Sequence, residues 1–293
     1  MKIAVTGSNG FLAHHLCVFL SQHGFDVIGC GRGENRVHSP ATFAYYTVEL
    51  TDVSSINHFF NTVRPLIIIH TAAMSKPDEC MQDPQACILH NITVTNLLAE
   101  AAKIHNTKFM YSSTDFIFGE GGPHGENDKP APLNFYGESK LMAEQQLLSI
   151  LPDAIIFRPV FIYGKQWPGM RGSFIHWVAN QLQAGNKIRV VMDQQRTPTF
   201  APDICNGILQ IIKTAQTGIF HLAGKDILSP YEMALAVADV LQLNNTLIEP
   251  VNADTFPEPV QRAKKSGLKI DKAIQLLQYE PHSFAAGVRM SFE

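Results

Sequence analysis

The stretch Val5-Thr-Gly7-Ser-Asn-Gly10-Phe-Leu-Ala13 joins an apolar run at residues 3–6 to a helical pattern at residues 11–22. Glycines at a strand-to-helix turn let the backbone approach a pyrophosphate, and the helix N-terminus favours its negative charge. Ala13 stands where the dinucleotide fingerprint tolerates alanine, although the first two glycines are spaced Gly-x-x-Gly rather than Gly-x-Gly. An ordinary tight turn is the alternative. The stretch favours a dinucleotide site with Gly7, Asn9, Gly10, Phe11 and Leu12 as its contacts.

Beyond this turn, short apolar runs alternate with helical patterns through the first half of the chain. The runs expected to be strands lie near residues 3–6, 25–29, 43–48, 66–70, 108–112 and 154–158. Such alternation predicts an α/β fold, a Rossmann-type doubly wound parallel sheet that binds ligands at the carboxyl ends of its strands. We assign residues 1–163 to a dinucleotide-binding domain and 164–293 mainly to a smaller α/β substrate-binding region. Strands near 187–191 and 219–222 are expected to return to the sheet.

Composition narrows the functional classes. The 293 residues are 45% hydrophobic and carry a formal net charge of -3, so neither nucleic acid nor anionic lipid is a favoured partner. We expect no membrane span and no secretory leader, because the chain starts directly with an apolar strand. Five cysteines without a Cys-x-x-Cys favour reduced thiols in a cytoplasmic protein over a disulfide framework or zinc site. The histidine spacing predicts no metal site.

The loop after the second expected strand bears on the choice of cofactor. It reads Gly29-Cys-Gly-Arg32-Gly-Glu34-Asn-Arg36, with no acidic residue before Glu34. An acid there would bind a ribose 2′-hydroxyl, whereas arginine suits a 2′-phosphate, so NADPH is favoured and NADH is the second choice. The arginines could instead be solvated loop charges. Asp52 is a candidate for the adenine edge or, equally, the N-cap of the next helix.

Tyr136 and Lys140 supply a pattern typical of proton transfer. They lie four residues apart in a predicted helix and therefore on one face. A phenol titrates near ~10, so a neighbouring ammonium that lowers its pKa would help it to exchange a proton. Ser113-Thr114-Asp115 follows the strand near 108–112, which places its hydroxyls at the carboxyl edge of the sheet.

Together these motifs resemble the extended short-chain dehydrogenases/reductases, and among them the dTDP-4-dehydrorhamnose reductase family. The matching segments span nearly the whole chain. They are residues 6–10, 64–73, 91–96, 113–119, 132–137, 158–159, 198–199, 221–222 and 262–268.

The resemblance implies a role for each matching residue. Tyr136 would be the general acid, Lys140 would bind the nicotinamide ribose and lower the tyrosine pKa, and Thr114 would hydrogen-bond the substrate oxygen. Asn91 would support a proton relay or hold the sheet edge. The further expected cofactor contacts are Ala72, Ala73 and Asn91, and the expected substrate contacts are Met74, Thr114, Asp115, Phe116, Phe161, Arg171 and Arg262.

Two departures from the family concern the substrate. Phe116 and Phe161 stand where the family often has tyrosine and tryptophan, so each keeps an aromatic wall and loses a hydrogen-bonding group. Arg171 and Arg262 are candidates for the phosphates of a nucleotide diphosphate. Either could instead be a surface ion-pair residue.

The predicted function is therefore NADPH-dependent reduction of the 4-keto group of a nucleotide-linked 6-deoxysugar. A sugar-nucleotide epimerase or dehydratase with bound NAD is one alternative, although dehydratases follow the threonine with Asp-Glu and this chain has Phe116. A second alternative is a non-catalytic regulator, since the chain also resembles the regulatory beta subunit of methionine adenosyltransferase. A homodimer is compatible with either reading, and the sequence does not decide whether a divalent metal aids assembly.

Overall fold

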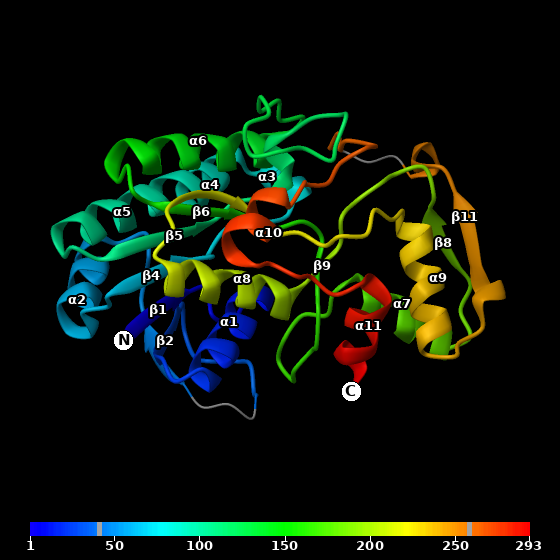
Figure 1. The fold of residues 1–293 in the computed structure, drawn as a ribbon, viewed down its shortest axis with the longest axis horizontal. Helices are drawn as coiled ribbons and strands as arrows, with labels where there is room; N and C mark the ends of the chain where they lie inside the picture. Colours follow the sequence, from blue (N-terminus) through cyan, green and yellow to red (C-terminus); the bar gives the residue numbers. More distant parts are fainter. Residues whose placement is uncertain (40–42, 257–259) are drawn as a thin grey trace.

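A parallel sheet of seven strands forms the centre of the computed structural model, which describes residues 1–39, 43–256 and 260–293 (Figure 1). In spatial order the strands are β10 Gly218–His221, β6 Ile155–Arg158, β5 Lys108–Ser112, β4 Ile67–His70, β1 Lys2–Thr6, β2 Asp26–Gly31 and β3 Ala44–Thr47. All neighbours pair in parallel. The predicted Rossmann-type doubly wound fold is confirmed.

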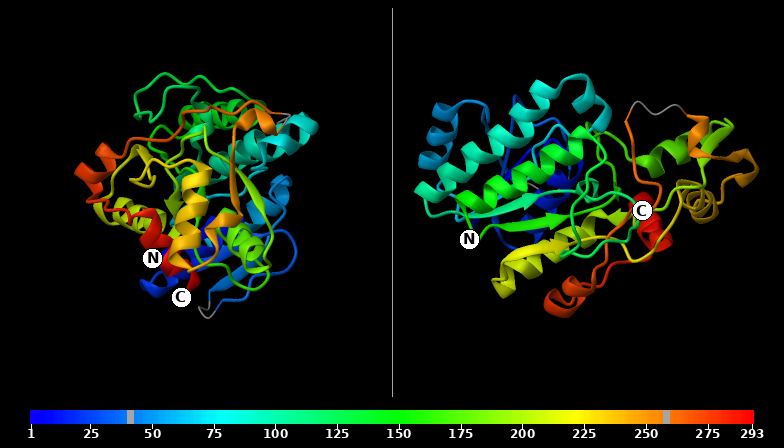
Figure 2. Two further views of the ribbon diagram at one scale, coloured as in Figure 1. Left: turned by 90° about the vertical axis from the view of Figure 1, so that its right-hand side faces the viewer. Right: turned by 90° about the horizontal axis from the view of Figure 1, so that it is seen from above.

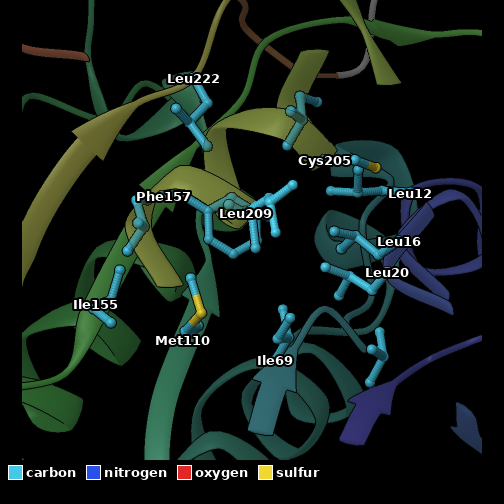
Figure 3. Packing of buried hydrophobic residues seen from close by; sticks show 14 of the residues in the cluster. Leu12, Leu16, Leu20, Ile69, Met110, Ile155, Phe157, Cys205, Leu209 and Leu222 are labelled. Carbon is cyan, nitrogen blue, oxygen red and sulfur yellow. The ribbon is translucent and has the colours of Figure 1, made fainter. Parts of the chain in front are cut away.

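Helices cover both faces of this sheet. Residues of α1 Phe11–Gln22, α8 Ala201–Thr214 and α10 Asp271–Leu277 form one hydrophobic core with one face. Residues of α2 Val53–Val63, α5 Val94–Ile104 and α6 Phe135–Ile150 form another core with the opposite face. In Figure 3, Leu12, Leu16 and Leu209 point toward the strand residues Ile69 and Phe157. Each such fully buried side chain contributes about 1.5–3 kcal/mol to folding.

The remaining elements gather beyond the carboxyl edge of the sheet, at one end of the molecule (Figures 1 and 2). They include α7 Phe174–Gln183, β8 Ile188–Val191, α9 Pro230–Val240, β11 Ile248–Val251 and α11 Phe284–Phe292. Most of these contribute to a further hydrophobic core. Two short strands, β7 Ile162–Tyr163 and β9 Thr199–Phe200, pair in parallel.

The expectation that the strand near 187–191 returns to the central sheet is wrong. Strand β8 pairs only with β11, in a separate two-stranded sheet. Ile188 and Val190 are buried while Arg189 between them is exposed, so β8 has one buried face. Central strands of a doubly wound sheet are buried on both faces, as β4 is throughout. The strand near 219–222 corresponds to β10, at the edge of the central sheet.

Short helices connect β4 to α5. They are α3 Pro77–Gln82, α4 Pro84–Cys87 and a π-helix, η1 Ile88–Thr93, that leads directly into α5. A 3-10 turn, η2 Asp115–Ile117, follows β5, and η3 Asn245–Leu247 and η4 Ala253–Thr255 flank β11. Among the described residues, no helix is both long and apolar enough to cross a membrane. All five cysteines are free thiols.

Candidate active site

A cavity of about 820 Å³ opens at the carboxyl ends of the central strands. The glycine loop between β1 and α1 forms part of its wall. Gly7 has a positive φ of 72°, and a Cβ added there would lie 2.9 Å from the Ala72 Cα, so glycine is required by both conformation and space. The loop therefore exposes bare backbone to the cavity, as a pyrophosphate site requires.

Most of the residues predicted from the sequence are brought together around this cavity. They are Gly7, Asn9, Gly10, Phe11, Leu12, Arg32, Ala72, Ala73, Met74, Thr114, Asp115, Phe116, Tyr136, Lys140 and Phe161. Four predicted residues, Asp52, Asn91, Arg171 and Arg262, do not line it.

Asp52 is the N-cap of α2, one of its two predicted roles. Its carboxylate oxygens accept hydrogen bonds from the backbone N–H groups of Ser54 and Ser55, both at 3.1 Å. Both oxygens therefore satisfy the start of the helix.

The loop after β2 is tied to the glycine loop through Asn9. Its Oδ1 accepts from the backbone N–H of Arg36 at 2.8 Å, and its Nδ2 donates to the Tyr45 hydroxyl at 3.2 Å. Arg32 and Arg36 both line the cavity. Glu49, just after β3, also lines the cavity. Hydrogen bonds from Thr51 lower the pKa of its carboxyl, and the nearby charge of Arg32 lowers it further. Because our sequence argument considered acids only directly after β2, it missed Glu49.

Thr114, Tyr136 and Lys140 meet at the floor of the cavity. Thr114 Oγ1 donates to Asp115 Oδ1 at 3.2 Å, and its hydroxyl lies near enough to the Tyr136 phenol to oppose the effect of burial on the phenol pKa. Lys140 Nζ donates to the Ser112 carbonyl at 2.7 Å. The Phe116 ring meets the Tyr136 ring edge-on, with centroids 5.5 Å apart. All three predicted catalytic side chains are buried, so their polar groups interact in surroundings that contain little water.

Burial shifts the pKa values of Tyr136 and Lys140 in a way that the sequence did not predict. Burial raises the pKa of Tyr136 above its ordinary value, and the hydrogen bond with Thr114 only partly opposes it. Burial also lowers the pKa of Lys140 to about 7, against the opposing charge of Glu144. The Tyr136 pKa is therefore raised overall, where the sequence argument expected it to be lowered, because desolvation dominates at both groups. At neutral pH Tyr136 is a protonated phenol, which is the form that can donate.

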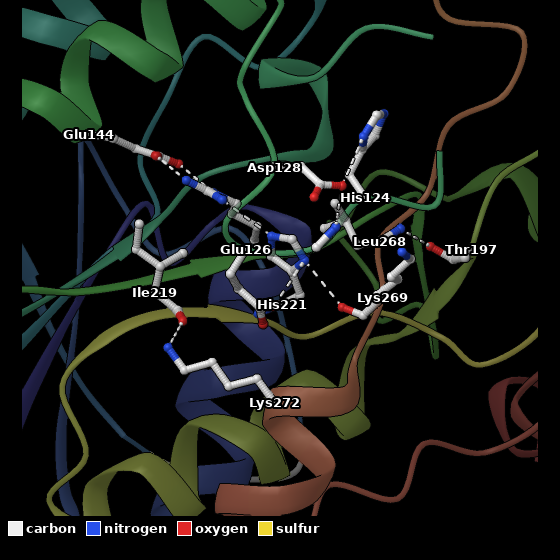
Figure 4. A network of polar contacts seen from close by, with 12 residues as sticks. His124, Glu126, Asp128, Glu144, Thr197, Ile219, His221, Leu268, Lys269 and Lys272 are labelled. Atoms are coloured by element: carbon white, nitrogen blue, oxygen red, sulfur yellow. Dashed lines mark hydrogen bonds and ion pairs between the residues drawn. The ribbon is translucent and has the colours of Figure 1, made fainter. Parts of the chain in front are cut away.

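A buried ion pair lies behind Lys140. Glu144, one turn further along α6, accepts from Arg158 Nη2 at 2.6 Å and Arg158 Nε at 2.9 Å. His221 of β10 lies 3.2 Å from Arg158 Nη1 and extends the network shown in Figure 4. The bidentate geometry satisfies both buried charges. Sequence reasoning did not identify this pair, whose members lie 14 residues apart on two consecutive elements, α6 and β6.

Asn91 occupies the π-helix behind the cavity wall. Its Oδ1 accepts from the Met74 backbone N–H at 2.8 Å, and its Nδ2 donates to the Met74 carbonyl at 3.1 Å. Nδ2 also lies 3.0 Å from Ser139 Oγ. Both bonds to the Met74 backbone hold the segment that follows β4 at the sheet edge, which corresponds to the second of the two predicted roles.

The two candidate phosphate ligands differ in position. Arg262 pairs with Asp78, with Nη2 and Oδ2 3.0 Å apart, and lines a second cavity of about 20 Å³ beside the first. Asp115 and Phe116 line both cavities, and Ser266 Oγ donates to Asp115 Oδ2 at 2.7 Å. Arg171 is exposed and lines neither of these cavities. Ser266 was missed as a site residue because its contact with Asp115 spans half the chain.

The fold and the cavity indicate the class of protein. Short-chain dehydrogenases/reductases typically combine a doubly wound sheet with a glycine loop, a threonine at a strand end and a helical Tyr-x-x-x-Lys, and this chain has all four features. Within this class, residues 1–293 match the family described as the RmlD substrate binding domain, and the chain belongs to that family. The resemblance inferred from the sequence is confirmed.

Relatives at the sequence level include a probable low-salt glycan biosynthesis reductase of Haloferax volcanii. It is 30% identical over 278 residues, which cover 92% of this chain and 90% of the relative. The beta subunit of methionine adenosyltransferase 2 of Mus musculus is 28% identical over 298 residues, covering 99% and 86%.

Two solved structures of dTDP-4-dehydrorhamnose reductases are similar throughout. The reductase of Clostridium acetobutylicum has a TM-score of 0.87 and 25% identity and covers 100% of this chain and 98% of its own. That of Bacillus anthracis, solved in complex with NADP, has a TM-score of 0.86 and 25% identity and covers 99% and 98%. UDP-glucuronic acid 4-epimerase of Bacillus cereus, at 23% identity and a TM-score of 0.84, shares the fold.

Proposed function

We propose that this chain is an NADPH-dependent reductase of the 4-keto group of a nucleotide-linked 6-deoxysugar. The observation that carries the proposal is that Thr114, Tyr136 and Lys140, all buried, lie together at a cavity that the glycine loop also lines. The reductase relatives support the substrate class. Free thiols support action in the cytoplasm.

The cavity residues fit a dinucleotide, because the glycine loop lines the cavity and α1 starts there with no side-chain cap, so its first backbone N–H groups can bind a phosphate. Gly7 and Gly10 would hold the pyrophosphate, and Arg32 the 2′-phosphate. The bound nicotinamide would supply the reducing equivalent to the sugar carbon. The chain's own residues would handle the proton and the charge.

Tyr136 donates its proton to the sugar oxygen as negative charge develops there. Thr114 hydrogen-bonds the same oxygen and so fixes its distance from the phenol. In its protonated form Lys140 stabilises the phenolate that remains, and burial strengthens that attraction. Met74, Asp115, Phe116 and Phe161 form the adjoining wall, where we place the sugar.

The proposal is tested by mixing purified protein with NADPH and a panel of 4-keto nucleotide sugars, dTDP-4-dehydrorhamnose included, and following the absorbance of the reduced nicotinamide. We expect substrate-dependent oxidation of NADPH. Oxidation of none of these sugars by protein that demonstrably binds NADPH would favour the regulatory function. That second candidate is supported by the 28% identity to methionine adenosyltransferase beta subunits over 99% of this chain.

Arg32→Ala should weaken NADPH binding by roughly tenfold or more and leave NADH binding nearly unchanged, because only NADPH carries the 2′-phosphate that a guanidinium binds. Fluorescence titration with each nucleotide measures the two dissociation constants. Glu49→Gln is the matched control: removing this neighbouring negative charge should strengthen NADPH binding. Equal weakening of both nucleotides by Arg32→Ala would remove the argument for a 2′-phosphate site.

The value of kcat/KM for NADPH should fall as pH rises through about 7. Lys140 has a lowered pKa of about 7, so it is an ammonium below that pH and a neutral amine above it. The charge that binds the nicotinamide ribose and stabilises the phenolate is therefore lost on the alkaline side. Tyr136 stays protonated across this range, because its pKa is raised. A pH–rate profile measures this; in Lys140→Arg, whose side chain stays charged, the alkaline fall should disappear.

A further inference from the structure

Cys80 and Cys87 form a buried pair of thiols beside the candidate active site. They come from α3 and α4, and each interacts with one member of the hydrogen-bonded pair Met74 and Asn91. Together with Tyr136 they form one small apolar cluster. The other three cysteines are buried elsewhere, in the two cores that pack against the central sheet.

Both thiols are connected by hydrogen bonds to Met74 in the cavity wall, Cys80 directly and Cys87 through Asn91. Cys80 Sγ donates to the Met74 carbonyl at 3.3 Å, and Asn91 Nδ2 donates to Cys87 Sγ at 3.3 Å. Asn91 in turn holds the Met74 backbone at both its N–H and its carbonyl. Met74 lines the large cavity. A chemical change at Cys80 therefore acts directly on Met74 in the cavity wall, and a change at Cys87 acts on Met74 through Asn91.

The environment of Cys87 favours its reactive form. The neighbouring Cys80 side chain lowers the pKa of Cys87 against the opposing effect of burial, with further contributions from Ser139, Asn91 and the charge of Lys140. The thiolate is the nucleophilic state of cysteine. Glu79 and Ala86, each preceding one cysteine in the sequence, line the large cavity, so both cysteines belong to segments that form its wall.

We propose that Cys80 and Cys87 are an oxidation site at which a peroxide forms a disulfide, and that this disulfide alters the cavity wall at Met74. The crosslink itself does not depend on the proposed function. Only its effect on turnover rests on the reductase proposal, so the two can fail separately.

The reaction balances with the peroxide as oxidant. The Cys87 thiolate attacks one peroxide oxygen, the O–O bond breaks, and a sulfenic acid forms while the released hydroxide takes up a proton. The Cys80 sulfur then attacks Cys87, the S–O bond breaks, and the hydroxyl leaves as water with the Cys80 proton. Two sulfurs are oxidised and hydrogen peroxide is reduced to two waters.

The disulfide is detected by mass spectrometry of the whole wild-type chain. Protein treated with hydrogen peroxide is denatured, alkylated and cut with trypsin. Because trypsin does not cut before proline, at Arg64-Pro65 or Lys76-Pro77, both cysteines and no other lie in the one peptide that follows Arg36 and ends at Lys103. We expect that peptide to lack both alkyl groups and two hydrogens, and to regain both alkylation sites after dithiothreitol. Full alkylation of both cysteines after treatment, or their crosslinking to other cysteines, would overturn the proposal.

The effect on the cavity is measured as NADPH-dependent turnover of the sugar before and after peroxide. The loss of two hydrogen bonds at the wall should lower kcat/KM by roughly tenfold, reversibly with dithiothreitol. Cys80→Ser should start near wild-type activity and form no crosslink. Cys205→Ala, which changes a core thiol outside the pair, should remain as sensitive as wild type. Equal inactivation of wild type and Cys80→Ser would show that the pair does not control the site.

Discussion

Tyr136→Phe should reduce turnover of the 4-keto sugar by at least about 10³-fold, because it removes the proposed proton donor and keeps the ring. The phenol and the Thr114 hydroxyl lie at the same cavity, close enough to influence each other. The Phe116 ring would still meet the aromatic ring at position 136, so the packing of this side chain is preserved. NADPH binding should change little, since the glycine loop and Arg32 remain.

Steady-state kinetics and a fluorescence titration of NADPH separate these two effects. Tyr231→Phe, which removes a hydroxyl from α9 outside the cavity, is the matched control and should keep wild-type turnover. Turnover of Tyr136→Phe within a few-fold of wild type would remove Tyr136 from its proposed role as acid.

Lys140→Met should impair both cofactor binding and turnover. Methionine keeps an unbranched chain of similar length and removes the buried ammonium, which donates to the Ser112 carbonyl at 2.7 Å. The phenolate left by proton donation would then lack its stabilising charge, so kcat should fall by about 10²-fold or more. The dissociation constant of NADPH should rise as well, which distinguishes this variant from Tyr136→Phe.

Steady-state kinetics and the fluorescence titration of NADPH also test Lys140→Met. The control for loss of a lysine charge is Lys129→Met, at an exposed position. Circular dichroism checks that the fold is kept. If Lys140→Met lost turnover with unchanged NADPH affinity, its proposed contact with the nicotinamide ribose would be wrong, while its electrostatic role would stand.

Local patterns predicted the fold and much of the cavity, because the relevant residues sit at strand ends that any doubly wound sheet brings together. Gly7 and Gly10 mark the first such end, and Thr114 marks another. Tyr136 and Lys140 were found from their helical spacing together with the glycine loop and Thr114, and their roles were taken from the family resemblance. In a parallel sheet, these residues from separate parts of the chain come together at one edge.

What depends on burial or on distant contacts could not be predicted. The lowered pKa of Lys140 follows from how deeply α6 is packed, which spacing does not encode. Ser266 reaches Asp115, and Cys80 reaches Cys87, only through loop conformations. The placement of β8 outside the central sheet depends on its pairing with β11, and a short apolar run does not specify its partner.

Transfer of deuterium tests the central claim most directly. Wild-type protein is incubated with dTDP-4-dehydrorhamnose and NADPH deuterated at the transferred position of the nicotinamide, and the sugar product is examined by mass spectrometry and NMR. The proposed function predicts one deuterium bonded to C4 of the sugar, with no such product from Tyr136→Phe. Unchanged sugar with wild-type protein that binds both ligands, or reduced sugar without deuterium at C4, would contradict it.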